Sequence, residues 1–148
     1  MNYGYITVAS AIPSVRVADA DYNIKQIESL IAQAEGKGAE IIVFPELSVT
    51  GYSCQDLFAQ QTLLDQTEMK ILQLLDFSRM LDIICIIGAP VCIGTGLYNC
   101  AVVCQHGNIL GIVPKRYLPN YGEFYEKRWF ASADDLDRPT EVRFAGNT

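Results

Sequence analysis

Two short, entirely apolar runs constrain the fold of this chain more than any other feature. The first is IIVF at residues 41–44, and the second is IICIIG at residues 83–88. Neither run alternates with polar residues, so each is typical of a strand that is buried on both faces. Such strands belong to parallel sheets covered by helices. We therefore expect an α/β protein.

The segments around these runs predict the remaining elements. A first strand is expected at residues 3–12, a second at 39–44, a third at 82–90, and a hairpin at 97–114 that turns at His106 and Gly107. Apolar residues at helical spacing predict one helix that begins at Asp19 or Asp21 and ends near residue 36, and another at residues 57–81. This order predicts a mixed sheet with helices on one face.

The size and charge of the chain limit which partners and locations are expected. The 148 residues, half of them hydrophobic, suffice for one domain with one core. The net charge is -6, with 17 acidic and 11 basic residues, so we expect no nucleic acid partner. No apolar run approaches the roughly 20 residues of a membrane span, and no secretory signal is visible. A cytoplasmic protein is expected.

Cysteine and histidine usage limits the chemistry. The chain has 5 cysteines without a C-x-x-C pair and a single histidine, so zinc binding is not expected. We expect all five thiols to be free core residues, as in a reducing compartment. One histidine also excludes a relay of the Ser-His-Asp type built from this chain. Carboxylates and lysines remain as proton-handling groups.

Two such residues follow strands. Glu46 comes directly after Pro45 at the end of the second strand, and Lys115 comes directly after Pro114 at the end of the hairpin. Ligands of α/β folds bind at the carboxyl ends of strands. If the strands share one sheet, both side chains emerge at one rim. Two alternatives stay open: Glu46 marks only where a strand reaches water, or the pair is structural.

The residues FPELSVTGY and PKRYLPNYGEFYEKRWF resemble the carbon-nitrogen hydrolase (nitrilase-like) superfamily. Through TGYSCQDLF and LPNYGEFYEKRWF the chain is most similar to the amino-terminal glutaminase domains of glutamine-dependent NAD+ synthetases. The resemblance extends from the first strand to about residue 130. It implies a four-layer αββα sandwich. Residues 1–148 are expected to be the amino-terminal part of that domain, incomplete at its carboxyl end.

The resemblance also implies site residues. Glu46 would be the general base, and Lys115 would stabilise the oxyanion. Glu123 matches a supporting glutamate near the lysine. The family's nucleophilic cysteine follows the lysine, whereas the last cysteine here is Cys104. We therefore expect a piece of a longer protein, inactive alone, rather than a member that has lost its chemistry.

A pocket and a reaction follow from the same resemblance. Tyr121 and Phe124 match positions that line the glutamine pocket, and Tyr52 matches a substrate-binding tyrosine near its entrance. Glutamine hydrolysis would supply ammonia to a downstream synthetase domain, absent from this chain, that uses ATP and magnesium to convert deamido-NAD+ to NAD+. No cofactor or metal is expected in the present segment, and a homo-oligomer is expected. Alternatives are a stand-alone amidase or nitrilase and a non-catalytic module.

Overall fold

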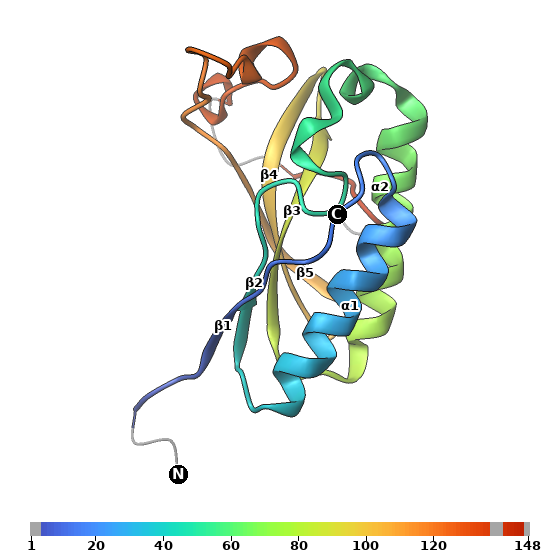
Figure 1. Cartoon of the computed structure of the whole chain (residues 1–148), viewed down its shortest axis with the longest axis vertical. Helices are drawn as coiled ribbons and strands as arrows, with labels where there is room; N and C mark the ends of the chain where they lie inside the picture. Colours follow the sequence, from blue (N-terminus) through green and yellow to red (C-terminus); the bar gives the residue numbers. More distant parts are fainter. Residues whose placement is uncertain (1–3, 137–140, 147–148) are drawn as a thin grey trace.

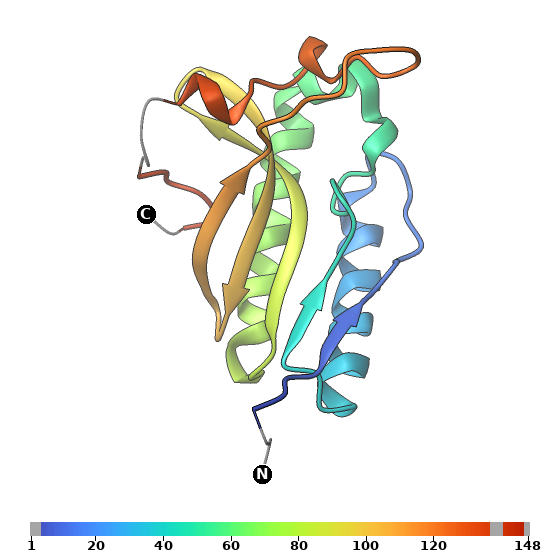
Figure 2. The same cartoon turned by 90° about the vertical axis from the view of Figure 1, so that its left-hand side faces the viewer.

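The strands form one mixed sheet. The computed structural model describes residues 4–136 and 141–146, with five strands in the order β1-β2-β3-β4-β5. Strands β1 and β2 pair in parallel, as do β2 and β3, whereas β3, β4 and β5 are antiparallel (Figure 2). Their bounds are Val8–Ser10, Ile41–Val43, Ile84–Ile93, Gly96–Gln105 and Asn108–Pro114. The expected α/β class and mixed sheet are confirmed.

Helices cover one face of this sheet (Figure 1). Helix α1 spans Ala20–Gly36 and helix α2 spans Gln61–Phe77. Asp19 caps α1, because its side chain accepts a hydrogen bond from the Tyr22 amide at 3.0 Å. Lys70 of α2 reaches Asp21 of α1 at 2.6 Å, so the two helices are also joined on their outer side.

The second helix begins later than expected. Residues Tyr52–Ala59 form the irregular 3₁₀ segment η1, and a further 3₁₀ turn, η2, follows α2 at Ser78–Met80. Within η1, Gln55 has φ 51° and ψ -131°, a backbone conformation that cannot continue a helix. The expected helical start at residue 57 was therefore wrong.

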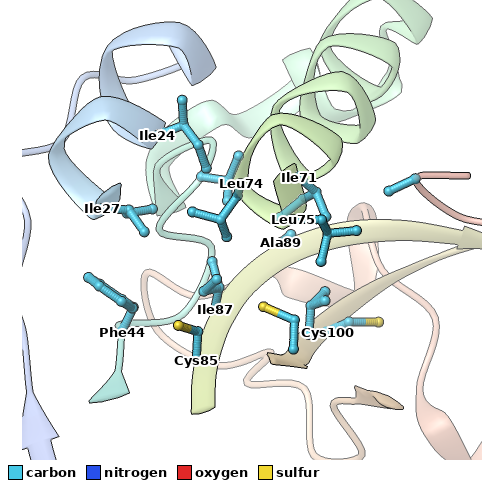
Figure 3. Close-up of a cluster of buried hydrophobic side chains, with 14 of the residues drawn as sticks. Ile24, Ile27, Phe44, Ile71, Leu74, Leu75, Cys85, Ile87, Ala89 and Cys100 are labelled. Atoms are coloured by element: carbon cyan, nitrogen blue, oxygen red, sulfur yellow. The ribbon is translucent and has the colours of Figure 1, made fainter. Parts of the chain in front are cut away.

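The core lies between the helices and the sheet (Figure 3). Isoleucines and leucines of α1 and α2 meet alternate residues of the strands, as the period-two geometry of a strand requires. These fully buried residues include Ile24, Ile27, Ile71, Leu74, Cys85, Ile87 and Val102. A second cluster contains Leu47, Cys54, Phe58, Leu63 and Phe130 and joins η1 to the chain after β5.

The remaining segments are short. Strand β1 is shorter than the expected residues 3–12, of which residue 3 lies outside the described part. The hairpin turns at His106 and Gly107, as expected. Both residues have positive φ. Two 3₁₀ turns follow β5, η3 at Glu126–Arg128 and η4 at Ala133–Asp135. Beyond them, the Ala145 amide donates to Glu68 of α2 at 2.9 Å.

Candidate active site

Glu46 lies in a tight turn between β2 and η1. Its neighbour Leu47 has φ 52°, which is uncommon for a residue other than glycine and is found mainly where surrounding structure enforces it. The turn lies directly over Gly88 of β3. A Cβ atom at Gly88 would lie 2.3 Å from the Leu47 amide nitrogen and 2.6 Å from the Pro45 carbonyl oxygen. Glycine is therefore required for the turn to hold Glu46 at this place.

Lys115 follows β5 at the same end of the sheet, since β2 and β5 point in the same direction (Figure 2). Its amide donates to the carbonyl of Asn99 in β4 at 2.7 Å, which extends the antiparallel pairing by one residue. Its ammonium contacts Glu46 Oε1 and donates to both oxygens of Glu126 at 3.0 Å. The two residues that follow prolines thus meet at one rim of one sheet, as the sequence led us to expect.

Glu126 was missed by sequence reasoning. It begins η3, and its side chain is only 1% exposed. Besides Lys115, the hydroxyl of Tyr52 donates to Glu126 Oε1 at 2.8 Å. A buried carboxylate requires such partners, because desolvating an unpaired charge is costly. Glu46, Lys115 and Glu126 form a charged cluster, and Tyr52 contacts it directly.

Glu123 makes no contact with Lys115 among the described residues, so its expected supporting role stays a prediction. Glu123 is exposed, whereas Glu126, three residues later, holds the lysine. The physical reason is the turn at residues 121–124, where the Phe124 amide donates to the Tyr121 carbonyl at 3.0 Å. After this turn the chain comes back toward the sheet, so Glu126 reaches the lysine.

The charges of this cluster support one another. Burial lowers the pKa of Lys115, but hydrogen bonds to Glu46 and Glu126 outweigh that effect, and the pKa lies above its ordinary value. Burial and the hydrogen bond to Glu126 raise the pKa of Tyr52. At neutral pH the lysine is therefore a cation and the phenol a hydrogen-bond donor.

Asn99 is a further residue that sequence reasoning missed. Its side-chain amide donates to Glu46 Oε1 at 2.5 Å, and only 3% of the residue is exposed. A signal was present, because asparagine is depleted in strands and here interrupts the apolar sequence of β4.

Tyr121 and Phe124 lie together on the turn after Lys115. Their rings are 6.0 Å apart in an edge-to-face arrangement, and Tyr121 is 72% exposed. In the part of the chain that the structure describes, no hydrogen bond or ring contact joins them to Glu46 or Lys115. Their expected place in a substrate pocket stays a prediction.

Comparisons with known proteins identify the family. The model of the carbon-nitrogen hydrolase family matches residues 7–145. The chain belongs to the carbon-nitrogen hydrolase family. The glutamine-dependent NAD(+) synthetase of Mycobacterium tuberculosis is 38% identical over 132 residues, which are 89% of this chain and 19% of that protein. The synthetase of Arabidopsis thaliana is 40% identical over 114 residues, 77% of this chain and 16% of that protein.

Solved structures agree with this assignment. The glutamine-dependent NAD(+) synthetase from Cytophaga hutchinsonii has a TM-score of 0.81 and 31% identity, over 86% of this chain and 22% of that chain. The NitN amidase from Neterenkonia sp. AN1 has a TM-score of 0.73 and 25% identity, over 87% and 50%. The present hydrolase chain spans about a fifth of the length of the curated synthetases it matches.

The cysteines of this carbon-nitrogen hydrolase chain are free. Cys54, Cys85, Cys100 and Cys104 are buried, as expected, and burial raises the pKa of Cys100 to about 12. Cys92 is exposed, so the expectation of a core position was wrong for it. Its neighbours in β3 face the helices, and strand alternation turns Cys92 to the opposite face.

Three hollows surround Trp129. Their volumes are about 280, 520 and 550 Å³, and each is lined by Trp129 and Arg128. Cys92 lines the smallest of them. Neither Glu46 nor Lys115 lines any of the three, so the charged cluster lies apart from these hollows.

Within residues 4–136 and 141–146, no three side chains of His, Cys, Asp or Glu are grouped as metal ligands. Over the same residues, neither helix is long and apolar enough to cross a membrane.

Proposed function

We propose that this chain carries part of the glutaminase site of a glutamine-dependent NAD+ synthetase. The observation that carries the proposal is the contact of the Lys115 ammonium with both Glu46 and Glu126. Membership of the carbon-nitrogen hydrolase family and similarity to synthetases that use glutamine support it.

Glu46 and Lys115 suit the hydrolysis of an amide by a thiol. A cysteine thiol is largely protonated at neutral pH, so a carboxylate must accept its proton before the sulfur attacks the carbonyl carbon. Glu46 would accept this proton and transfer it to the leaving ammonia as the carbon-nitrogen bond breaks. Lys115 would stabilise the oxyanion of the tetrahedral intermediate. Water would then cleave the thioester and release glutamate.

The thiol of this reaction is proposed to lie outside the present residues. Cys54, Cys85, Cys100 and Cys104 are buried in the two cores, and no contact joins them to Glu46 or Lys115 among the described residues. Cys92 lies at the hollow beside Trp129, apart from the charged cluster. The proposal therefore predicts a nucleophile from chain that follows residue 148, and no activity from these residues alone.

The rest of the proposed protein follows from the same similarity. Ammonia from glutamine would be used by a synthetase domain that consumes ATP, with magnesium, to convert deamido-NAD+ to NAD+. We propose a cytoplasmic homo-oligomer. A second candidate, an amidase for another small amide, is favoured by the similarity to the NitN amidase.

Mutations in the protein as it is encoded test the proposal. Glu46→Gln and Lys115→Ala should each lower NAD+ formation from glutamine by about 100-fold or more and leave formation from ammonium salts intact. Glu28→Gln and Lys25→Ala, which alter a partly buried carboxylate and an exposed ammonium on α1, are the matched controls. Equal loss with both nitrogen sources would assign the pair a structural role, and ammonia release from other amides alone would favour the amidase.

A further inference from the structure

Asn99 is a buried polar residue within the largely apolar strand β4. Its neighbours Tyr98 and Cys100 face the helices, so Asn99 faces the opposite side of β4. Only 3% of it is exposed. A buried amide requires hydrogen-bond partners, and the side chain of Asn99 has its partner at the charged cluster.

The side chain and the backbone of Asn99 both contact the charged cluster. The side-chain Nδ2 donates to Glu46 Oε1, and the backbone carbonyl accepts the Lys115 amide at 2.7 Å. One residue of β4 therefore determines the separation between a carboxylate that follows β2 and a lysine that follows β5. The contact of Asn99 with Glu46 joins residues 53 positions apart in the sequence.

The two oxygens of Glu46 have different surroundings. Oε1 accepts from Asn99 Nδ2 and from Lys115 Nζ. Within the described residues, Oε2 accepts no hydrogen bond. Because both donors hold the same oxygen, rotation of the carboxylate would break two contacts at once. Oε2 is left free to exchange a proton.

We propose that Asn99 is a positioning residue that holds Oε1 of Glu46, so that Oε2 is the oxygen that accepts the proton of the nucleophile. This role rests on the proposed glutaminase function. Asn99 does not touch the substrate. It acts through the orientation of the base, and a misplacement of about 1 Å in such a group costs roughly 100-fold in rate.

The groups around Glu46 show what Asn99 adds to its positioning. Lys115 contacts Glu46, while Glu126 and Tyr52 lie behind the lysine. Asn99 adds a neutral donor to the same carboxylate oxygen. Without this donor, Lys115 is the one remaining partner of Glu46 Oε1 among the described residues, so the orientation of the carboxylate is less fixed.

Two variants of the encoded protein test this role. Asn99→Leu removes the donor at similar size, and Asn99→Asp keeps the shape but places a second carboxylate beside Glu46. Both should lower kcat for glutamine by about 100-fold and change KM little. The ammonium-driven rate should stay at the wild-type level. Gln105→Leu is the matched control, because it removes the hydrogen bond that the Gln105 side-chain amide donates to the Asp82 carbonyl at the far end of β4.

Each outcome decides between explanations. An active wild-type protein whose two variants keep the wild-type kcat for glutamine overturns the role of Asn99 alone. Parallel loss of the glutamine and ammonium rates also overturns it, because that is the result of a structural role. A wild-type protein that releases no ammonia from glutamine overturns the proposed function, and the role of Asn99 with it.

Discussion

At the scale of single residues, Glu126 is a buried carboxylate whose charge has to be compensated by its partners. Its side chain is 1% exposed, and its partners are Lys115 and the Tyr52 hydroxyl. Replacing a buried ion pair by apolar groups is often neutral, whereas removing one partner leaves a charge that water cannot reach. The lysine therefore contributes to stability as well as to the proposed chemistry.

This asymmetry gives a stability prediction. Lys115→Met leaves Glu126 buried without a cation and should destabilise the protein by about 3 kcal/mol, the low end for a broken buried pair. The low end applies because the lysine side chain is 27% exposed. Adding Glu126→Gln should restore most of the loss, since the neutral amide can still accept from Tyr52. Thermal denaturation of the encoded protein measures both changes.

The control for this rescue is Glu123→Gln in the same Lys115→Met background. Glu123 is exposed, so removing its charge should restore nothing. Equal recovery from both substitutions would show that net charge, and not the buried contact with Glu126, determines the stability.

The sequence predicted the part of the site that depends on local rules. Glu46 and Lys115 each follow a proline at a strand end, and that pattern alone indicated a common rim. Glu126 escaped because its contacts depend on the turn at residues 121–124 and on Tyr52, which lies 74 residues away along the chain. Asn99 escaped because its partner Glu46 is 53 residues away, although a polar residue inside an apolar strand was a readable signal.

At the scale of elements, side-chain hydrogen bonds and ring packing join the segment η1 to η3 and the residues after it. Asp56 of η1 accepts from Arg128 Nε at 2.7 Å and Nη2 at 2.9 Å, and from Trp129 Nε1 at 2.9 Å. These bonds hold the pKa of Asp56 well below its usual range. Phe58 packs on Phe130 with ring centroids 4.9 Å apart. Such long-range contacts favour a 3₁₀ segment where apolar periodicity alone predicted a helix, and sequence spacing does not show them.

The hydrogen bonds of Asp56 predict that replacing this residue changes the local dynamics of η1 and η3. Asp56→Ala removes the acceptor for both Arg128 and Trp129, so η1 and η3 should open more often. Amide hydrogen exchange should become faster at residues 52–59 and 126–130 and stay unchanged in α1. Asp76→Ala is the control, because it breaks an exposed ion pair between Asp76 of α2 and Arg79 of η2. Wild-type exchange rates in the Asp56 variant would show that packing of Phe58 alone holds these segments.

At the scale of the whole molecule, one face of the sheet has no covering layer within the described residues (Figure 1). Val8, Val43 and Val113 lie on this face and are 60%, 38% and 59% exposed. Parallel strands such as β1 and β2 occur almost only in sheets that are covered on both sides. In the four-layer sandwich expected from the sequence, a second sheet would cover these residues.

The open face predicts how the 148-residue chain behaves alone. Its contiguous apolar surface should drive self-association, because burying that surface removes it from water. Sedimentation velocity over a wide range of concentrations should show a growing apparent mass. Val43→Lys combined with Val113→Lys should reduce it, because a buried lysine pays a desolvation penalty, while Met80→Lys, at a residue 92% exposed outside the sheet, should not. A monomer with a sharp, concentration-independent melting transition would show that this face is stable in water without a partner layer.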